Sequence, residues 1–504
     1  MTLAGLIGIL PQKSVNGDAG ASAVTGVSYD SRTVTPGSVF VCIKGFKLDG
    51  HDFVADAVAR GAAAVIAERP VDSRGVPVVL VPDSRAALAM VASQFYSHPS
   101  KEMRVIGVTG TNGKTTTTHL IRWVLAHSGR EAGLVGTVEN IVCGKSLPVE
   151  RTTPEATDLQ DLFRRMRSCG STHAVMEVSS HALELHRVAG TEFDVAVFTN
   201  LTQDHLDFHP TMEAYFRAKS ILFESLGGAY SGAPKAGRKA AVINTDDPFG
   251  RRLCGLVKVQ TVTYGLEDGA QFAARDIEMT ARGNSFTLVW PGGSARFAMR
   301  LAGRFNVYNT LAAVAAAWVE GIDPLDAREA LQRHRGVAGR FELVDEGQEF
   351  AVAVDYAHTP DGLRNILEAA RGVTRGRLIC VFGCGGDRDR KKRPIMGEIA
   401  ARLADFCVIT SDNPRSEDPS AVIAEIEPGV RRGGKGAGGY AVEPDRKAAI
   451  ELAVGMARPG DIVVIAGKGH ETYQIFRDRT IYFDDREIAR EALRVRTLGG
   501  PGAR

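Results

Sequence analysis

The residues with the clearest chemical potential lie in the stretch Gly110-Thr-Asn-Gly-Lys-Thr115, which follows an apolar run over residues 105–108. Backbone N–H groups of such a turn, and of a helix that begins after it, can surround a phosphate group. Lys114 supplies positive charge for the β- and γ-phosphates, and the Thr115 hydroxyl can ligate Mg²⁺. An ordinary glycine-rich turn is the alternative, but strand, turn, Lys-Thr pair and helix occur here together. We therefore predict a site for a nucleoside triphosphate.

Two later stretches could supply metal ligands. Glu177 lies in a predicted buried strand, where a carboxylate is unfavourable unless it is ion-paired or bound to a metal. The His- and Asp-rich segment 204–209 follows a predicted strand over residues 193–199, at the strand end where open α/β sheets bind ligands. A structural ion pair and a satisfied polar loop are the alternatives. Beside a phosphate loop, we predict that Glu177 and His205 join Thr115 in a Mg²⁺ site.

Polar residues also follow four predicted strands in the last third of the chain, over residues 350–354, 378–382, 406–410 and 462–466. The segments after these strands contain Asp355, Arg388, Asp412, Asn413, Pro414, Arg415, Gly467 and Glu471. The carboxyl ends of parallel strands meet at one edge of a sheet, so we predict a single ligand site there. The glycines of segment 383–386 resemble a dinucleotide-binding turn only weakly, because the rest of that fingerprint is absent.

Three α/β domains are predicted to position these residues. The chain has 504 residues, 44% of them apolar, which suits about three domains of about 150 residues each. A linker at Tyr96-Ser-His-Pro-Ser100 and a change of composition at Arg335-Gly-Val-Ala-Gly339 set the boundaries. The predicted domains span residues 1–101, 102–337 and 338–504, with a β-rich segment near 235–300.

Periodicity places the remaining elements. Predicted strands cover residues 24–29, 38–43, 63–67, 78–81, 133–137, 174–178 and 240–243, and predicted helices cover 51–60, 84–95, 115–125 and 158–166. Tyr29-Asp-Ser-Arg32 ends a strand and either faces a ligand or caps a turn. Lys219 lies on a helix, where periodicity alone predicts a surface lysine. Asn306 and Asn309 share one side of a helix start and either read a base or cap the helix.

Composition narrows the possible ligands. Lys plus Arg number 61 and Asp plus Glu 59, a formal charge of +2 that would not hold nucleic acid or a membrane surface. The seven cysteines are scattered, which predicts reduced thiols and neither a disulfide framework nor a zinc site. The start MTLAGLIGILPQK lacks the marks of a signal peptide and is predicted to be a helix, and no run is long enough to span a membrane. We expect a cytoplasmic monomer that binds small molecules.

Together these motifs resemble the Mur ligases, the ATP-dependent enzymes that build the peptidoglycan stem peptide. The resemblance spans nearly the whole chain and rests on Gly110-Thr-Asn-Gly-Lys-Thr115, Glu177 with Ser179-Ser-His181, Asn200-Leu-Thr-Gln-Asp-His205, Lys219, Gly303-Arg-Phe-Asn-Val-Tyr-Asn309 and Asp355-Tyr-Ala-His358. It implies a three-domain architecture with a central parallel sheet of the P-loop ATPase type and a Rossmann-like C-terminal domain.

Within that family, other segments resemble the members that add meso-2,6-diaminopimelate to UDP-N-acetylmuramoyl-L-alanyl-D-glutamate. These segments are Tyr29-Asp-Ser-Arg32, Arg151-Thr-Thr-Pro154, His186-Arg187 and Asp412-Asn-Pro-Arg415. Lysine-adding relatives lack the arginine of the last segment. Diaminopimelate carries a second carboxylate that the Arg415 guanidinium can bind with two hydrogen bonds, whereas lysine has no group there.

The resemblance implies a role for each matched residue. It implies ATP binding by Gly110, Thr111, Asn112, Gly113, Lys114, Thr115 and Thr116, with Asn309, Arg340 and Asp355 at the adenine, phosphate and ribose. Mg²⁺ would be held by Thr115, Glu177, His205 and a carbamylated Lys219, and the catalytic set would be Lys114, Glu177, His205 and Lys219. The uridine diphosphate would lie at Tyr29, Ser31 and segment 46–48, and the muramoyl dipeptide at Thr152, Thr153, Ser179 and Arg187. Diaminopimelate would lie at Arg388, Asp412, Asn413, Pro414, Arg415, Gly467 and Glu471. Arg151 and Leu185 depart from some relatives, which have asparagine and glutamine there.

The implied reaction needs no protein nucleophile. ATP phosphorylates the D-glutamyl γ-carboxylate, and the amine of diaminopimelate then displaces phosphate from the acyl phosphate. This agrees with a sequence that shows neither a nucleophile elbow nor a Cys/His arrangement. Two alternatives remain at this stage. A folylpolyglutamate-synthetase-type ligase would not need a uridine-binding domain, and a nucleotide-gated switch protein would leave Arg388 and Arg415 unexplained.

Overall fold

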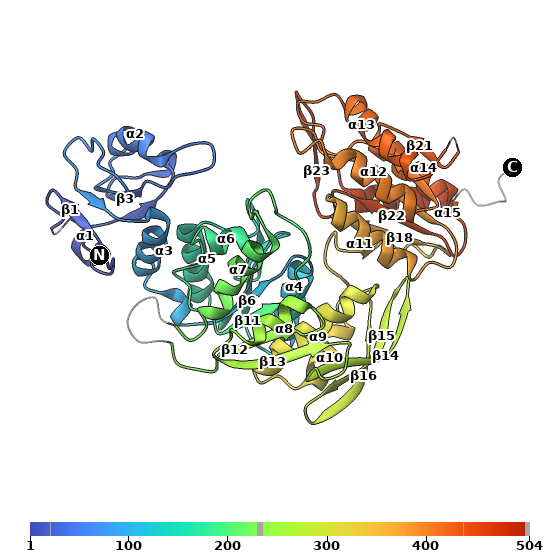
Figure 1. The fold of residues 1–504 in the computed structure, drawn as a ribbon, viewed down its shortest axis with the longest axis horizontal. Helices are drawn as coiled ribbons and strands as arrows, with labels where there is room; N and C mark the ends of the chain where they lie inside the picture. Colours follow the sequence, from blue (N-terminus) through green and yellow to red (C-terminus); the bar gives the residue numbers. More distant parts are fainter. Residues whose placement is uncertain (21, 229–234, 437, 499–504) are drawn as a thin grey trace. The chain divides into compact units, whose positions relative to one another are not determined.

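The computed structural model describes residues 1–20, 22–228, 235–436 and 438–498 (Figure 1). It divides into two compact units. One comprises Met1–Gln271 with Ala312–Ala327, and the other comprises Phe272–Leu311 with Arg328–Arg504. The predicted α/β class is confirmed, because each unit contains parallel strands with helices packed against them.

The N-terminal part of the first unit is a five-stranded sheet with the order β1-β5-β4-β3-β2. Its strands are β1 (Ser14–Asn16), β2 (Gly26–Ser28), β3 (Ser38–Val41), β4 (Ala64–Ala67) and β5 (Val78–Leu80), all parallel except β1. Side chains alternate between two cores, as a strand period of two requires. Val39 and Val41 face α1 (Leu3–Ile7) and α3 (Ser84–Phe95), whereas Phe40 faces α2 (Val54–Ala59).

The central sheet of the first unit carries the phosphate loop. Its strands follow the order β13-β12-β11-β6-β10-β7-β8-β9. They are β6 (Arg104–Thr109), β7 (Ala132–Val135), β8 (Asn140–Val142), β9 (Lys145–Leu147), β10 (His173–Glu177), β11 (Val195–Phe198), β12 (Ala240–Asn244) and β13 (Gln260–Gly265). All are parallel except β8 and β9. β6, β7, β11 and β12 are buried and largely apolar, as expected for a parallel sheet covered on both faces.

Helices pack against this sheet. They are α4 (Lys114–His127), α5 (Ala156–Ser168), α6 (Ser180–Glu184), α7 (Met212–Glu224) and α8 (Pro248–Cys254). Leu159 and Phe163 of α5 share one core with Phe216 and Leu222 of α7. This core fixes α7 against the sheet and therefore fixes the position of Lys219 along it.

The second unit begins with an antiparallel meander and continues into the C-terminal sheet. The meander consists of β14 (Phe272–Thr280), β15 (Gly283–Trp290) and β16 (Gly293–Met299). In the chain it is followed by α9 (Arg304–Val319) and α10 (Pro324–Gln332), whose residues are divided between the two units. The sheet has the order β17-β18-β22-β19-β20-β21, parallel except for β17. Its strands are β17 (Glu342–Leu343), β18 (Ala351–Asp355), β19 (Leu378–Phe382), β20 (Phe406–Ile409), β21 (Tyr440–Val442) and β22 (Ile462–Ala466). The carboxyl ends of β18, β22, β19 and β20 therefore meet at one edge, as predicted.

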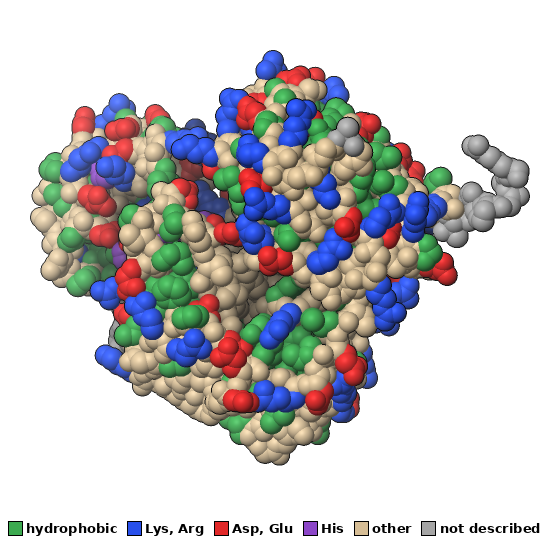
Figure 2. All heavy atoms as spheres, turned by 45° about the vertical axis from the view of Figure 1, so that its right-hand side comes forward, with side chains coloured by type: hydrophobic (Ala, Val, Ile, Leu, Met, Phe, Trp, Pro, Cys, Tyr) green, Lys and Arg blue, Asp and Glu red, His purple; other side chains and the backbone are tan. Residues whose placement is uncertain are grey.

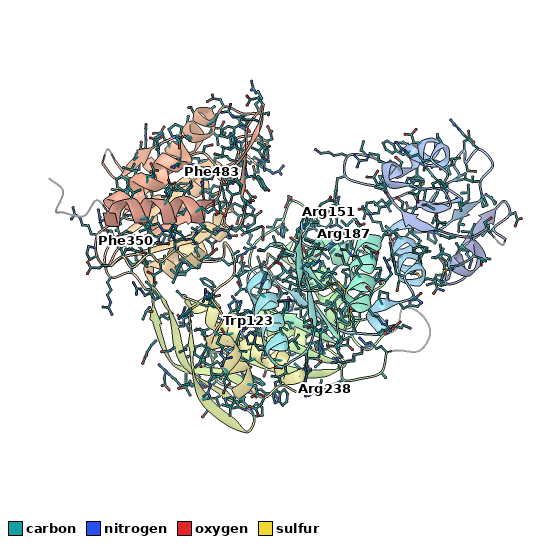
Figure 3. The ribbon with its side chains drawn as sticks, turned by 180° about the vertical axis from the view of Figure 1, so that it is seen from behind. Trp123, Arg151, Arg187, Arg238, Phe350 and Phe483 are labelled. Atoms are coloured by element: carbon teal, nitrogen blue, oxygen red, sulfur yellow. A yellow bond between two sulfur atoms is a disulfide. The ribbon has the colours of Figure 1, made fainter. Side chains whose placement is uncertain are left out.

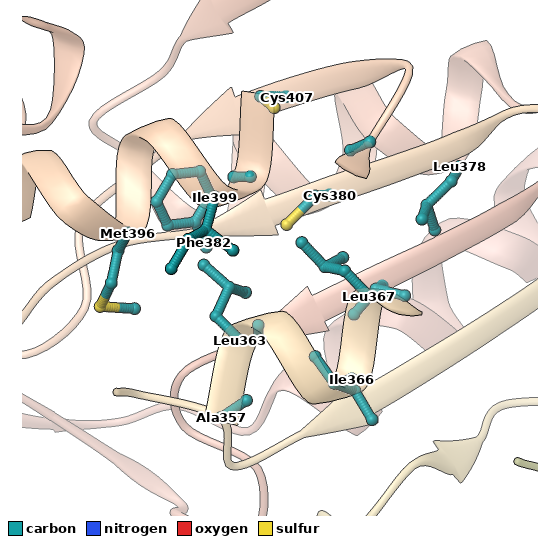
Figure 4. Packing of buried hydrophobic residues seen from close by; sticks show 14 of the residues in the cluster. Ala357, Leu363, Ile366, Leu367, Leu378, Cys380, Phe382, Met396, Ile399 and Cys407 are labelled. Carbon is teal, nitrogen blue, oxygen red and sulfur yellow. The ribbon is translucent and has the colours of Figure 1, made fainter. Parts of the chain in front are cut away.

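Two cores hold the C-terminal sheet. Leu378, Cys380 and Phe382 face one core, part of which Figure 4 shows, whereas Ile379 and Val381 face the other. The first core contains α11 (Pro360–Arg371), α12 (Lys392–Leu403) and α13 (Pro419–Arg432), and the second contains α14 (Arg446–Met456) and α15 (Asp485–Leu498). A small hairpin of β23 (Tyr473–Ile475) and β24 (Thr480–Tyr482) follows β22.

Several sequence predictions need correction. The helix predicted over residues 51–60 is a 3-10 turn (Gly50–Phe53) followed by α2, because Asp49 accepts the His51 N–H (3.0 Å) and caps the turn first. Cys143 and Cys169 form a disulfide with their Cα atoms 5.6 Å apart, against the expectation of reduced thiols alone. They are 26 residues apart, and only the fold brings the β8–β9 turn to the end of α5.

The surface matches the nearly balanced charge. In Figure 2, blue and red side chains are interspersed over the face in view, as the formal charge of +2 leads us to expect. No helix in the described ranges combines the length and the apolar character that a membrane crossing requires.

Candidate active site

The phosphate loop connects β6 to α4 through two left-handed glycines. Gly110 has φ +147° and Gly113 has φ +87°, conformations that side chains with a Cβ rarely adopt. An added Cβ at Gly110 would also collide with the Thr199 hydroxyl. Gly113 is the cap residue of α4 and offers no side chain to its first N–H groups. The loop is therefore shaped for close approach of an anion to a helix N-terminus.

Side chains from the neighbouring strand hold the loop in place. Asn200 accepts the Asn112 N–H (2.9 Å) and donates to the Asn112 carbonyl (3.1 Å), and its own carbonyl accepts the Thr111 N–H (2.8 Å). Thr199 donates to the Asn112 carbonyl (2.6 Å). Thr116 is buried in the first turn of α4. The residues predicted to bind the nucleotide, from Gly110 to Thr116, thus form one loop and helix start, and hydrogen bonds from Thr199 and Asn200 hold the loop in place.

Two lysines converge on the carbonyls of this loop. Lys114 Nζ donates to the carbonyls of Gly110 (2.9 Å) and Thr111 (2.8 Å), and Lys219 Nζ donates to the Gly110 carbonyl (3.0 Å). Lys219 is only 2% exposed, so the prediction of a surface lysine from periodicity alone is wrong. Burial, with help from the Lys114 charge, lowers the pKa of Lys219 well below its ordinary value. Burial of Lys219 therefore favours its neutral amine more than exposure to solvent would.

Glu177 lies at the end of β10, at the centre of a chain of hydroxyl groups. Its carboxylate accepts from the Thr115 hydroxyl (3.1 Å), the Thr137 N–H (2.7 Å) and the Thr137 hydroxyl (3.1 Å). Thr137 in turn lies 3.0 Å from the Thr152 hydroxyl. The Glu177 carbonyl accepts from Thr153 (2.9 Å), whose hydroxyl accepts the Ser179 N–H (3.1 Å). The structure thus connects Thr115 with Thr152, Thr153 and Ser179.

His205 belongs to a different group of contacts. It has φ +55°, its Nε2 lies 3.5 Å from Asp204 Oδ2, and its ring meets His181 edge-on at 4.8 Å. Burial lowers the pKa of His205, which favours the neutral imidazole that binds metals. Within the described ranges, His205 makes no hydrogen bond to Thr115 or Glu177, and no three His, Cys, Asp or Glu side chains cluster as a metal site. The structure therefore joins two of the predicted Mg²⁺ ligands and leaves His205 apart.

The Tyr29-Asp-Ser-Arg32 segment contains the turn cap that was one of the two alternatives considered for it. Asp30 accepts the Arg32 N–H (2.9 Å) and caps the 3-10 turn Ser31–Thr33, in which Ser31 is buried. Tyr29 donates its hydroxyl to Asp158 Oδ2 (2.7 Å), and burial together with that carboxylate raises the Tyr29 pKa. Asp30 is thus a capping residue, whereas Tyr29 makes a contact with the central sheet's α5.

Three arginines surround one buried carboxylate beside the hydroxyl chain. Glu155 is 3% exposed, and its oxygens lie 3.3 Å from Arg85, 2.9 Å from Arg151 and 3.0 Å from Arg187. Arg187 also donates to the Thr153 carbonyl (3.3 Å). Figure 3 shows Arg151 and Arg187 beside each other on this part of the unit. Three guanidinium groups on one carboxylate leave positive charge for an anionic ligand.

The remaining predicted residues of the first unit are spread more widely. Phe46 and Leu48 are exposed, and the ring of Phe46 meets that of Phe208 edge-on at 5.8 Å. Leu185 is the C-terminal cap residue of α6, and no contact ties it to Glu177 in the described residues.

In the second unit, Asp355 holds the backbone at the end of β18. Its carboxylate accepts the N–H groups of Phe341 (2.7 Å) and Ala357 (2.8 Å), and its burial raises its pKa. Its carbonyl accepts the Gly467 N–H (3.0 Å), which joins the ends of β18 and β22. Arg340 lies over the Tyr356 ring at 5.1 Å. The Asp355 carboxylate therefore orders the turn that follows Arg340.

Asn309 is held by its own helix. Its Nδ2 donates to Asn306 Oδ1 (3.0 Å), and Asn306 donates to the Ala302 carbonyl (2.8 Å). Both asparagines are buried. The two residues face one side of the helix, as the spacing predicted, and Asn306 connects the helix start to the Ala302 carbonyl.

The motif Asp412-Asn-Pro-Arg415 lies at the end of β20 and contacts the segment after β22. Asn413 donates to Glu471 Oε2 (2.9 Å), and the fully buried Lys468 donates to the same oxygen (3.0 Å) and to Asn413 Oδ1 (3.2 Å). A Cβ added at Gly467 would meet Asp412 Oδ2 at 2.6 Å. These four predicted residues from two strand ends therefore lie together, with Pro414 buried beside them.

Arg415 and Arg388 occupy neighbouring loops. Arg415 has φ +53°, and its Nη1 donates to the Gly386 carbonyl (2.8 Å). Arg388 is exposed and has only a long contact with the Asp387 carbonyl (3.5 Å).

A fully buried ion pair supports both strand ends. Arg446 of α14 binds Asp485 of α15 through two nitrogens, each 2.7 Å from a carboxylate oxygen. The same guanidinium donates to the carbonyls of Ser411 (3.3 Å) and Ala466 (3.0 Å), which directly precede the motif residues. Burial of this pair locks β20 and β22 to the helices beneath them.

Several residues of this site were not predicted from the sequence. Thr137 connects Glu177 with Thr152, Glu155 collects the arginines, and Lys468 connects Asn413 with Glu471. The only signal for Glu155 and Lys468 was a charge beside a motif residue. Thr137 gave no signal, because a threonine at a strand end is common.

Comparison with known proteins gives matches along most of the chain. A model described as Mur ligase family, catalytic domain matches residues 23–96, one described as Mur ligase middle domain matches 108–317, and one described as Mur ligase, glutamate ligase domain matches 339–469.

Individual relatives cover nearly the full length. The UDP-N-acetylmuramoyl-L-alanyl-D-glutamate--2,6-diaminopimelate ligase of Syntrophomonas wolfei is 50% identical over 472 residues, 94% of this chain and 95% of that protein. The ligase of the same name from Geobacillus thermodenitrificans is 50% identical over 473 residues, again 94% and 95%. A solved structure of a ligase of this name is 34% identical, with a TM-score of 0.69, and covers 98% of this chain and 99% of its own.

Proposed function

The chain belongs to the Mur ligase family, and from this membership we propose that it uses ATP to join meso-2,6-diaminopimelate to UDP-N-acetylmuramoyl-L-alanyl-D-glutamate. The observation that carries the proposal is the group of Asp412, Asn413, Gly467 and Glu471 at one sheet edge, with Arg415 beside it. The relatives that share half of its residues over nearly its full length bear the name of this activity. Those relatives disfavour both the folylpolyglutamate-synthetase-type ligase and the switch protein.

The phosphate loop would bind and polarise ATP. Lys114 lies over the loop carbonyls and can turn toward the β- and γ-phosphates, where it would neutralise charge as the γ-phosphoryl group moves to the D-glutamyl carboxylate. The amine of diaminopimelate then attacks the acyl phosphate and phosphate leaves. Holding two anionic substrates in register supplies much of the rate increase. We further propose that Asn309, Arg340 and Asp355 contact the adenine, phosphate and ribose.

The residues around Glu177 fit a Mg²⁺ ion. The Thr115 hydroxyl and the Glu177 carboxylate are hard oxygen donors in mutual contact at the phosphate loop, which is the ligand chemistry that Mg²⁺ prefers. Bound there, Mg²⁺ would neutralise phosphate charge. His205 would join them through its neutral imidazole, and Lys219 as a carbamate. The lowered pKa and burial of Lys219 support that modification, since CO₂ reacts with a neutral amine.

We assign the residues that would bind each substrate by the same reasoning. Thr152, Thr153, Ser179 and Arg187 would hold the muramoyl dipeptide, since hydroxyl groups and a guanidinium meet there. Tyr29, Ser31 and segment 46–48 would hold the uridine diphosphate. Arg388, Asp412–Arg415, Gly467 and Glu471 would hold diaminopimelate. We propose that the domains span residues 1–101, 102–337 and 338–504, and the three family-model ranges fall within them. We also propose that the protein is a cytoplasmic monomer.

Phosphate release is the decisive assay. The protein is incubated with ATP, Mg²⁺, UDP-N-acetylmuramoyl-L-alanyl-D-glutamate and one amino acid at a time. We expect release that depends on meso-diaminopimelate. Preference for L-lysine, or hydrolysis without any acceptor, would contradict the proposal.

Arg415→Ala tests the proposed diaminopimelate site in the same assay. Loss of a bidentate guanidinium–carboxylate contact should lower kcat/KM for diaminopimelate by a factor corresponding to about 2 kcal/mol or more. Arg479→Ala, at an exposed arginine of the β23–β24 hairpin, is the matched control and should behave like the wild type. Equal activity of the two variants would refute the role of Arg415.

A further inference from the structure

Two loops at the carboxyl edge of the C-terminal sheet carry the arginines proposed to bind the amino acid. The loop after β19 carries Arg388, and the loop after β20 carries Arg415. Neither arginine forms an ion pair with any residue that the structure describes. Both charges therefore remain for a ligand, and their separation depends on how the two loops are held together.

Backbone and side-chain hydrogen bonds join the two loops. The Gly386 N–H donates to the Asn413 carbonyl (2.9 Å), and Arg415 Nη1 donates to the Gly386 carbonyl (2.8 Å). Asp387 accepts from the Ser416 N–H (3.1 Å) and hydroxyl (2.5 Å). A Cβ at Gly386 would collide with the Pro414 carbonyl, so the loops are in close contact.

Glu417 lies where these contacts meet the helix below. Its Oε1 accepts the Asp387 N–H (2.7 Å) and Arg393 Nη2 (2.7 Å), and its Oε2 accepts Arg393 Nη1 (2.9 Å). Arg393 is fully buried, and its second partner is Glu425 (2.9 Å). One carboxylate of the second loop therefore binds the first loop and a buried guanidinium of α12 together. Hydrogen bonds between such charged groups are about twice as strong as neutral ones.

The conformation of Arg415 makes its position depend on these supports. Its φ of +53° is uncommon for a residue with a side chain and persists where neighbours enforce it. Its N–H donates to the Ile475 carbonyl (3.0 Å), and its Nη1 relies on the Gly386 carbonyl of the other loop. If that loop moves, the guanidinium loses the partner that orients it.

From these contacts we propose that Glu417 is a positioning residue, which sets the place of Arg415 and so the affinity for diaminopimelate. The inference rests on the proposed function and deepens it. Glu417 is not one of the residues proposed to bind diaminopimelate, and its own contacts are to Asp387 and Arg393. It acts by fixing the loop of Arg388 and Gly386 against the loop of Arg415, and a bidentate contact with a carboxylate tolerates little displacement.

Glu417→Gln tests this with the full-length protein. Glutamine keeps an oxygen for the Asp387 N–H and removes the charge that binds Arg393, whose partner Glu425 remains to stabilise the fold. We expect KM for diaminopimelate to rise about tenfold, the scale of one charged hydrogen bond. The KM values for ATP and UDP-N-acetylmuramoyl-L-alanyl-D-glutamate should stay within about twofold of wild type, since the phosphate loop is untouched. A merely structural defect would instead lower kcat and leave every KM unchanged.

Glu427→Gln is the matched control. Glu427 lies on α13, the helix that follows Glu417, with similar side-chain exposure (27% against 23%), and it pairs with Arg431 and Tyr440 rather than with the loops. Ser416→Ala, at an exposed position, repeats the test if Glu417→Gln folds poorly, and should raise the same KM by a smaller factor.

The outcomes separate the inference from the function on which it rests. An unchanged KM for diaminopimelate in both loop variants overturns the positioning role. Equal rises in KM for all three substrates overturn it as well. If the wild type itself fails to use diaminopimelate, the proposed function is wrong, whatever the variants do.

Discussion

The buried pair Arg446–Asp485 offers a direct test of what supports the proposed diaminopimelate site. Both side chains are fully buried, and two hydrogen bonds of 2.7 Å join them. Asp485→Asn keeps the shape and removes the negative charge, so the Arg446 cation stays buried without its counter-ion. Breaking a buried pair in this way typically costs about 3–5 kcal/mol.

That loss should be large enough to measure directly. For units of 150–250 residues, each kcal/mol shifts Tm by about 2–4 °C, so the C-terminal unit should melt about 6–20 °C earlier. Thermal unfolding gives the shift, and hydrogen exchange of the β20 and β22 peptides localises it. Because Arg446 also holds the Ser411 and Ala466 carbonyls, KM for diaminopimelate should rise at temperatures below the transition.

Two further variants test whether the loss of Tm comes from leaving a buried charge without its partner. Asp478→Asn removes a carboxylate from an exposed pair 3.6 Å apart and should change Tm little, since exposed pairs contribute about 0–1 kcal/mol. The double variant Arg446→Met with Asp485→Leu removes both charges and should recover much of the stability. If Asp485→Asn melts with the wild type, or the double variant is less stable than the single one, the pair is not the support that its burial indicates.

Two more predictions concern titrating groups. Lys219→Met should lower ligase activity about 10–100-fold and raise the Mg²⁺ concentration for half-maximal activity, the scale seen when residues around a metal site are lost. The exposed Lys258→Met is the control, and an unchanged Mg²⁺ dependence of Lys219→Met would contradict the proposed carbamate. Burial, followed by the Arg340 and Arg486 charges, lowers the pKa of His470 from 6.5 to about 4, so the unfolded chain binds this proton more readily and stability falls as pH drops from 6.5 toward 4. His470→Gln should lose less Tm over that interval than the wild type, and parallel Tm–pH curves would rule out this contribution.

Much of the fold could be read from the sequence because its strands are short, apolar and bounded by turn residues. The strands predicted over 378–382 and 462–466 match β19 and β22 at both ends. The loop from Gly110 to Thr115 could be predicted as well, since glycine readily adopts the left-handed conformations that this turn requires at Gly110 and Gly113.

The features that could not be predicted from the sequence depend on contacts between segments that are far apart in the chain. Helical periodicity cannot show that the loop after β6 covers Lys219, so that a lysine on α7 is buried. Cys143 and Cys169 become partners only once β8 and α5 are folded. The same holds for the connection from Thr115 through Glu177 to Thr137, which joins three strand ends of one sheet.

The strand order of the C-terminal sheet also decides when the enzyme can become complete. β22 lies between β18 and β19 and pairs with both, yet the chain reaches it after β18, β19, β20 and β21. On the ribosome, β18 and β19 must therefore wait for a partner that is translated near the end. N-terminal segments generally fold first, so a nascent chain would fold its phosphate loop before the C-terminal sheet could be completed. Premature termination before Ile462 would leave a fragment that has the phosphate loop but lacks β22 and the sheet edge proposed to bind the amino acid.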